Sequence, residues 1–520
     1  MRERKTVAKT TRSHPSWTIL RSCCIAAGVA LLALSAPVQA AGNLTVAQQR
    51  DPDNLDPIDT FLLAWGSIGS NIFDGLVFRN EALEILPGLA TSWEFLDDNS
   101  RIRFELRESV TFHNGEPFNA EAVKFTFDRL LGEEGEKGPQ RSNYTSIGSV
   151  EIVDDYTVDF MMAQPDPVMI SKLAGYGAMI VPPQYISEVG EEEFDIKPVG
   201  TGPFKVVEYT PSVGLALERF DDYWGEKANL DTLNIRFIPE PATRMAELLS
   251  GGIDVALNIP ISAVDTIEAN DQIELVAVPG PTVNLIRFKT DGGVTADPNV
   301  RKAINMAIDR GAIVDALLKG YGSTVASLQS AKSFGFDPNL EAYPYDPQQA
   351  QALLAEAGVA TGTEVVLDIR NNDDTFREVA QAVASYLGAV GLQVSLKPHE
   401  TSVFFSEIVP KGQTGEMFQF GWGGWTFDFD NTAYLLYHSG EFWNPYTKIE
   451  ELDALLEKQR QTYDTAVREE TLQEVAGYAH EIALDVPLYN LDTLYGVNEK
   501  VKGFIPAPDD RVRYAPVSVE

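Results

Sequence analysis

One stretch of the chain, residues 418–431 (FQFGWGGWTFDFDN), concentrates side chains suited to binding a small molecule. It places Trp422 and Trp425 among three glycines, with Asp428 and Asp430 just beyond. Indole rings offer rigid, flat stacking surfaces with one N–H donor each. Glycines let the backbone turn sharply and approach another body closely. The stretch is therefore either a ligand-binding segment or a core strand followed by an ordinary turn.

Catalytic patterns are weak. Asp428 and Asp430 could act as the carboxylate pair of a glycosidase, although two acids this close in sequence more often cap a turn. A secreted hydrolase of glycans or peptides is therefore kept as the alternative function. No Gly-x-Ser-x-Gly elbow or phosphate-binding loop with lysine occurs. We expect neither a metal nor a cofactor, because no zinc-helix spacing joins the histidines beyond residue 40, which are His113, His399, His438 and His480.

The N-terminus reads as a secretory signal peptide, residues 1–40. A basic segment over 1–21 precedes an apolar run over 23–34, and small residues follow at Val38 and Ala40. The apolar run is too short to span a bilayer as a stop-transfer helix. The pattern predicts cleavage after Ala40 and a secreted, water-soluble protein.

The cysteine content and net charge of the chain limit the disulfides and the classes of partner that are expected. Both cysteines, Cys23 and Cys24, lie inside the leader. The mature chain would therefore contain no thiol and need no disulfide. The formal net charge of the full sequence is −35. Nucleic acids and anionic membranes need basic surface, so neither is expected as a partner. The length predicts about three domains at ~150 residues each, or two domains with one of them interrupted.

Hairpins dominate the first half of the chain. Residues 100–107 alternate apolar and polar, which predicts a half-buried strand. Asn119 can cap a helix that runs to residue 131, and residues 150–160 read as a hairpin. Residues 68–77 are expected to be helical.

Strands and helices alternate in the second half. Residues 298–319 read as one long helix, and 347–357 as another that begins at a capped proline. A parallel crossover is predicted from the strand, helix and strand at 364–370, 375–390 and 392–397. The overall class is α/β with mixed sheets.

Several motifs together resemble one family. In chain order they are 86–94 (LPGLATSWE), 104–107 (FELR), 110–124 (VTFHNGEPFNAEAVK), 200–204 (GTGPF), 222–225 (DYWG), 297–305 (DPNVRKAIN), 307–309 (AID) and 486–489 (VPLY). This series resembles the family 5 solute-binding proteins of bacterial ABC importers, whose members take up peptides, nickel, glutathione and related solutes.

The resemblance implies a two-lobed fold of the type II periplasmic-binding-protein class, with an extra small domain. A solute would bind between the lobes, and a membrane permease would read their closure; the protein would be periplasmic and monomeric. Hinge closure of this kind works because the ligand binds the closed form better. The hinges would be residues 283–288 and 487–491. The implied boundaries are 41–64, 197–282 and 487–520 for lobe one, 65–196 for the extra domain, and 283–486 for lobe two.

Trp422 matches a pocket tryptophan of the family, but the pattern then changes. Peptide binders of the family usually carry an aspartate three residues later, which pairs with the ligand's α-amino group; here that residue is Trp425. An indole offers stacking or cation–π attraction of roughly 0.5–2 kcal/mol in place of an ion pair. The ligand could therefore be peptide-like, opine-like or an oligosaccharide. Glu441 or Asp51 could replace the missing acid.

The other candidate ligand-binding residues follow from their positions in the family template. They are Gln49 and Arg50 in the loop after the first strand, Trp65, Arg141 and Asn143 in the extra domain, Asn284 and Arg287 on the outgoing crossing strand, Trp443 and Arg370 in lobe two, and Tyr489 and Asn490 on the return. Four of the tryptophans could stack on sugar rings: Trp65, Trp422, Trp425 and Trp443.

Overall fold

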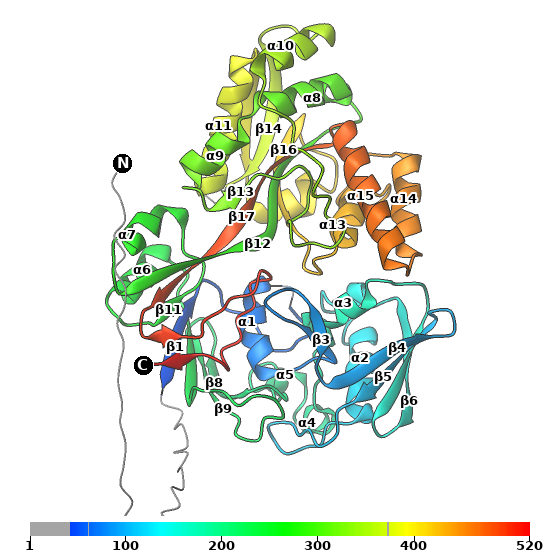
Figure 1. The fold of residues 1–520 in the computed structure, drawn as a ribbon, viewed down its shortest axis with the longest axis vertical. Helices are drawn as coiled ribbons and strands as arrows, with labels where there is room; N and C mark the ends of the chain where they lie inside the picture. Colours follow the sequence, from blue (N-terminus) through cyan, green and yellow to red (C-terminus); the bar gives the residue numbers. More distant parts are fainter. Residues whose placement is uncertain (1–41, 61, 372–373) are drawn as a thin grey trace, which may run out of the picture. The chain divides into compact units, whose positions relative to one another are not determined.

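The computed structural model describes residues 42–60, 62–371 and 374–520 (Figure 1). The predicted signal peptide lies outside these ranges. Over the described ranges, no helix combines the length and apolar character needed to cross a membrane.

A mixed sheet of eleven strands forms the framework. In spatial order its strands are β15 (Leu392–His399), β14 (Thr363–Arg370), β16 (Met417–Gly423), β12 (Ile273–Phe288), β17 (Asp485–Asn498), β11 (Val255–Ala256), β1 (Asn43–Gln48), β10 (Thr232–Phe237), β9 (Gly214–Arg219) and β8 (Phe204–Thr210), with β13 (Gly322–Ser323) paired to β17.

The long antiparallel strands β12 and β17 join the two ends of this sheet (Figure 1). Their pairing runs from Ile273 opposite Asn498 to Arg287 opposite Asp485, with a register shift between Pro279 and Val283. Strand β16 pairs with the far half of β12, so the Trp422 segment lies beside the crossing strands. The fold is the expected two-lobed α/β class with mixed sheets.

The parallel crossover is confirmed. β14 and β15 pair in parallel, and α11 (Asp374–Ala389) connects them. The single long helix expected over 298–319 is wrong, because the chain forms α8 (Pro298–Ala307) and α9 (Arg310–Leu317). Ile308 is extended, and the Asp309 side chain accepts the N–H of Ala312, which starts a new helix. α10 (Pro347–Glu356) begins at its proline as predicted.

A separate four-stranded antiparallel sheet has the order β4 (Ala90–Leu96), β5 (Arg101–Leu106), β7 (Thr157–Met162) and β6 (Ile147–Asp154). The β6–β7 hairpin is confirmed, and α2 (Ala120–Leu131) is capped by Asn119, which accepts the N–H groups of Glu121 and Ala122. Phe104, Phe127 and others fill a core between this sheet and α2.

The helix expected over 68–77 lies earlier, as α1 (Leu63–Ile72). The helix ends at Phe73, whose N–H donates to the Gly69 carbonyl. The chain then forms β2 (Val77–Arg79), which pairs with β3 (Ile85–Pro87). The remaining helices are α3 (Met169–Leu173), α4 (Pro183–Val189), α5 (Glu191–Phe194), α6 (Pro241–Leu249), α7 (Val264–Glu268), α12 (Thr401–Val403), α13 (Phe429–Tyr437), α14 (Glu450–Arg460) and α15 (Thr465–Glu481). The remaining strands, β18 (Val501–Lys502) and β19 (Ser518–Val519), pair with each other.

Two of the sequence motifs meet at His113. Its Nδ1 accepts the N–H of Gly200 at 3.2 Å, and its Nε2–H donates to the carbonyl of Gly202 at 2.9 Å. Burial lowers the pKa of His113 to about 4, so the ring is neutral at physiological pH. The imidazole thereby fastens the 110–124 motif to the 200–204 motif.

Candidate functional site

A cavity of about 720 Å³ opens beside the end of β16. This volume lies within the range of roughly 300–1,000 Å³ that is usual for small-molecule sites. One side consists of Ser142, Asn143, Thr145, Ser146, Gln164, Pro165, Asp166 and Lys172, and the other of Gly421, Trp422, Gly423, Trp425, Asp430, Asn431, Tyr434, Leu435, Glu441, Trp443 and Arg460, with Thr282 of β12 between them. Two segments far apart in sequence therefore build one site.

Aromatic rings form one wall. Trp422 stacks on Phe420 with ring centroids 5.7 Å apart and meets Trp443 edge-on at 5.8 Å. The indole N–H of Trp422 is buried and has no hydrogen-bond partner within the described part of the chain. A buried donor without a partner favours a ligand that supplies an acceptor.

Trp425 lies where the two sides of the cavity meet. A Cβ placed on Gly175 would come within 2.5 Å of Cζ3 of Trp425, so the indole packs against the bare backbone of that glycine. The carbonyl groups of Trp425 and Thr426 accept hydrogen bonds from Arg79 at 3.1 and 2.9 Å. The turn that carries Trp425 is therefore held from outside its own strand.

Four of the charged side chains in the lining form two pairs. Lys172 Nζ lies 2.6 Å from Asp166 Oδ2, which also accepts from the Ser146 hydroxyl at 2.6 Å. Arg460 contacts both oxygens of Asp430, through Nε at 2.6 Å and Nη2 at 3.0 Å. Each cation is thus neutralised by a neighbouring carboxylate.

The Asp430–Arg460 pair is fixed by further contacts. Burial alone would raise the pKa of Asp430, but the Arg460 charge and the Gln459 amide lower it below its ordinary value. The Arg460 guanidinium also covers the Tyr434 ring, with Cζ 3.3 Å from the ring centroid. This pair shapes the wall of the cavity and keeps its charge at neutral pH.

Asp428 is held in the same manner. Both of its oxygens lie 2.6 Å from the Arg468 guanidinium, and Oδ1 also accepts the N–H of Asp430 at the start of α13. Asp428 and Asp430 thus cap and brace a turn, as acids this close in sequence often do. Neither acid is positioned as a free general acid or base.

Glu441 differs from the other acids in the lining. Its side chain is half-buried. Across residues 42–60, 62–371 and 374–520, no hydrogen bond or ion pair to its carboxylate is observed. Asp51, the other acid considered as a counter-charge, does not line the cavity; it accepts from the Tyr209 hydroxyl at 2.5 Å and from the N–H of Ser212. Glu441 is therefore the acid available to a ligand.

Hydrogen bonds from Asn444 and Arg287 hold the loop that carries Glu441. The Asn444 amide donates to the carbonyls of Tyr437, His438 and Thr447 at 2.8, 3.1 and 2.9 Å. Arg287 donates to the Trp443 carbonyl at 2.8 Å. Arg287 thus holds the backbone of the lining residue Trp443 and does not line the cavity itself.

Asn284 lies on β12, next to the lining residue Gly421. It pairs with Gly421 across β12 and β16, and it is 1% exposed. A Cβ on Gly421 would come within 3.3 Å of Asn284 Oδ1, and that oxygen has no hydrogen-bond partner among the described residues. The glycine therefore leaves room above an unsatisfied acceptor.

Other predicted residues lie outside the lining. Trp65 is fully buried in the core, where its ring is 6.1 Å from Phe73 and 5.3 Å from Tyr176. Arg370 lies over the rings of Phe376 and Phe405 at 4.4 and 5.4 Å.

The two residues on the return strand are also buried. Tyr489 is 1% exposed and belongs to the core cluster that also contains residues of α8 and α9. The Asn490 amide donates to the carbonyls of Gly280 and Thr282 at 2.9 and 2.8 Å, so Asn490 supports the lining residue Thr282 from behind.

The first-strand loop points elsewhere. Gln49 and Arg50 are exposed and absent from the lining, and the buried Gln48 amide donates to the Arg50 carbonyl at 2.7 Å. Arg141 Nε donates to the Leu131 carbonyl at 2.9 Å, whereas its neighbour Asn143 does line the cavity. The structure therefore brings Asn143, Trp422, Trp425, Trp443 and Glu441 together.

Sequence reasoning missed the lining residues of 164–172 and of α13. Asn431, Tyr434 and Leu435 recur at helical spacing after the capping Asp428, which is a signal that could have placed them on one face. Asp166 and Lys172 lie in a turn and a short helix whose local sequence contains no comparable pattern.

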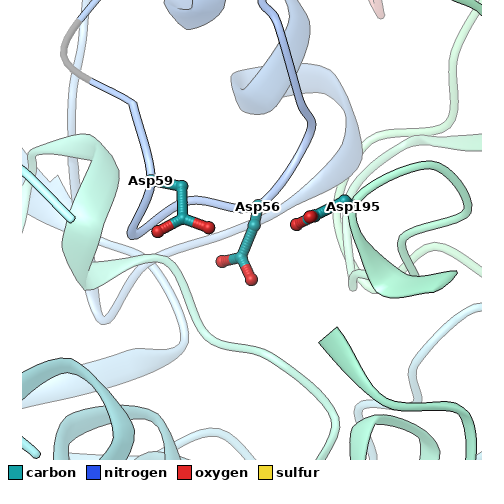
Figure 2. Close-up of side chains that lie close together, drawn as sticks. All are labelled: Asp56, Asp59 and Asp195. Carbon is teal, nitrogen blue, oxygen red and sulfur yellow. The ribbon is translucent and has the colours of Figure 1, made fainter. Parts of the chain in front are cut away.

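Asp56, Asp59 and Asp195 form a separate carboxylate group away from the cavity (Figure 2). Among groups of three or more His, Cys, Asp or Glu side chains in the described residues, this is the one whose ligand atoms all lie within 4.8 Å of one another. The Arg129 guanidinium contacts both oxygens of Asp56, with Nη1–Oδ1 at 3.0 Å and Nη2–Oδ2 at 2.5 Å. The charge of the group is thus partly balanced by a side chain of the protein itself.

Comparisons with known proteins agree with this geometry. The chain is 28% identical over 506 residues to the glutathione-binding protein GsiB of Pectobacterium atrosepticum, covering 95% of this chain and 97% of that protein. It is 26% identical to the dipeptide-binding protein of Escherichia coli, with coverage of 95% and 98%.

Solved structures share the fold. HbpA2 from Haemophilus parasuis aligns with a TM-score of 0.83 at 26% identity, over 92% of this chain and 100% of that one. The ABC transporter-associated periplasmic binding protein DppA from Helicobacter pylori, in complex with the peptide STSA, aligns with a TM-score of 0.77 at 26% identity, over 92% and 98%. The family model for bacterial extracellular solute-binding proteins, family 5, matches residues 84–444. With more than half of its length matched, the chain belongs to this family, the solute-binding proteins of ABC importers.

Proposed function

We propose that this protein captures a small solute in the cavity beside Trp422 and delivers it to the membrane permease of an ABC importer. The observation that carries the proposal is the lining itself: residues 142–172 face residues 421–460 across a space of about 720 Å³. A ligand that contacts both sides would favour the arrangement in which they are close.

The solute class follows from the relatives and from the lining. Relatives are named for glutathione, dipeptides and haem, and a solved neighbour holds agropinic acid. The solute proposed here is accordingly small and peptide-like, opine-like or an oligosaccharide. Trp422, Trp425, Trp443 and Asn143 are the predicted binding residues that line the cavity.

Closure would take place about the crossing strands. The proposed lobes are 41–64 with 197–282 and 487–520, and 283–486, with the extra domain at 65–196. The register shift between Pro279 and Val283 interrupts the β12–β17 pairing just before the second lobe, which suits a hinge. The protein would act as a periplasmic monomer after removal of residues 1–40.

The hydrolase alternative receives no support. It depended on Asp428 and Asp430, and both carboxylates are engaged by arginines, Arg468 and Arg460. The relatives are binding proteins. Transport without catalysis is therefore the proposal.

Native mass spectrometry of the protein as purified from its periplasm provides the test. We expect a bound small molecule in the wild type and its loss in Trp422→Ala. Phe442→Ala, which changes an exposed ring next to the lining residue Trp443, is the matched control and should retain the molecule. The proposal fails if deletion of the gene leaves uptake of that molecule by cells unchanged.

A further inference from the structure

We propose that the solute carries a cationic group and that Glu441 is its counter-charge, an inference that rests on the cavity being the solute site. It deepens the proposed function by selecting one chemical class, organic cations such as amines and guanidines, over neutral sugars and anionic ligands.

The charges of the lining give the first argument. Its cations, Lys172 and Arg460, are already paired with Asp166 and Asp430. The carboxylate of Glu441 is left without an ion pair in the described structure. A partly desolvated carboxylate is stabilised by an opposite charge at hydrogen-bond distance, so the empty site favours a cation.

The position of Glu441 gives the second argument. Asn444 and Arg287 hold its loop by donating to five backbone carbonyls, and Arg287 Nε also lies 3.0 Å from Asp485 Oδ1. The N–H of Glu441 itself donates to the His438 carbonyl at 3.3 Å. A charge on a pre-organised loop loses little conformational entropy when it binds a ligand.

A second acceptor points in the same direction. Asn284 Oδ1 is buried without a partner immediately below Gly421, which lines the cavity. An unsatisfied buried oxygen costs about 1–3 kcal/mol until a donor reaches it. Ammonium and guanidinium groups carry several donors, so they can satisfy this oxygen. The unpaired N–H of Trp422 needs an acceptor from another part of the same solute, such as a carbonyl.

The aromatic wall suits the same class. Trp422 and Trp443 face the space with Glu441 in the same lining. Indole faces attract cations through their quadrupole, and the attraction grows when water is excluded. An aromatic wall with one free carboxylate therefore recognises an organic cation better than an anion.

Isothermal titration calorimetry with a matched panel tests the inference. The cations are trialanine amide, whose capped carboxyl end leaves only the ammonium charge, agmatine and spermidine. Their fully N-acetylated forms keep much of the body and remove the amine charges, the guanidinium of agmatine being replaced by a neutral urea. Maltotriose and glutarate represent neutral and anionic solutes. We expect the wild type to bind at least one cation and to bind its uncharged form at least tenfold more weakly.

Variants locate the charge. Glu441→Gln should weaken binding of that cation about 10- to 100-fold, because it removes one partner of a partly buried ion pair. Glu378→Gln, the same change at an exposed site on α11, should leave affinity unchanged. Equal binding by wild type and Glu441→Gln, or no binding of any cation, overturns the inference. Binding of maltotriose or glutarate that Trp422→Ala abolishes would overturn it while leaving the proposed function intact.

Discussion

The guanidinium of Arg79 donates a hydrogen bond to the backbone carbonyl of Trp425, 3.1 Å away, although the two residues are 346 positions apart in the chain. The same group donates to the Thr426 carbonyl at 2.9 Å and lies 3.6 Å from Asp509. Arg79 therefore connects strand β2, the C-terminal segment and the turn that carries Trp425. Burial lowers the pKa of Arg79 to about 10, and the side chain stays charged at neutral pH.

Arg79→Lys should weaken solute binding about tenfold. Lysine keeps the charge but loses the planar fork that reaches two carbonyls at once, so the Trp425 turn would be less firmly held. Calorimetry with the tightest-binding panel cation measures the change. Arg377→Lys, at an exposed position on α11, is the control. Unchanged affinity in Arg79→Lys would show that the turn is fixed without this contact.

Trp425→Ala should reduce affinity at least as much as Trp422→Ala. Both rings line the cavity, but Trp425 also packs against Gly175 on the opposite side, so its removal affects the wall and the contact across it. Titration of both variants with the same cation decides between them. Full affinity in Trp425→Ala would assign this indole to packing alone.

The motifs predicted the fold better than the site. Regular patterns with local causes were readable: Asn119 caps α2, and β14, α11 and β15 form the expected crossover. The break between α8 and α9 was missed, because a capping Asp309 inside an apolar stripe looks like an ordinary helical residue until the chain turns there.

Burial decided which predicted site residues reach the cavity. Trp65 resembled a binding tryptophan, yet its ring is buried in the core, where it packs against the backbone of Gly69. Glu441 and Trp443 reach the cavity because Arg287 and Asn444 hold their loop. The contact between Arg287 and Trp443 links residues 156 positions apart, and no local sequence pattern reports it.

His113 should make stability depend on pH. Its folded pKa is about 4 and its ordinary value is 6.5, so the unfolded chain takes up the proton first as pH falls. Stability should therefore fall between pH 6.5 and 4, by an amount on the order of 3 kcal/mol for this group. Urea unfolding of wild type and His113→Gln at pH 7.5, 5.5 and 4.5 isolates the contribution.

The variant should lose less stability on acidification than the wild type. If the stabilities of wild type and His113→Gln fall equally as the pH is lowered, the imidazole of His113 is not the group that titrates.

Asp195 should have the opposite dependence. Burial, with the charges of Asp56 and Asp59, raises the pKa of Asp195 to about 6 from an ordinary 3.8. The folded state holds this proton more tightly, so the stabilisation is complete below pH 3.8 and is lost as pH rises through 6. Asp195→Asn removes the charge and should be more stable than wild type at pH 8, by on the order of 1 kcal/mol. At pH 3, below the ordinary pKa of 3.8, the two proteins should be equally stable.

The same variant decides whether the three carboxylates of Figure 2 bind a metal. Arg129 already engages both oxygens of Asp56, so we expect EDTA and millimolar Ca²⁺ to leave the melting temperature of the wild type unchanged. A divalent ion in the cluster would instead raise that temperature in the wild type and not in Asp195→Asn, since binding to the folded state alone stabilises it. It would also reverse the order of stability at pH 8, because the ion would compensate the charge that the variant removes.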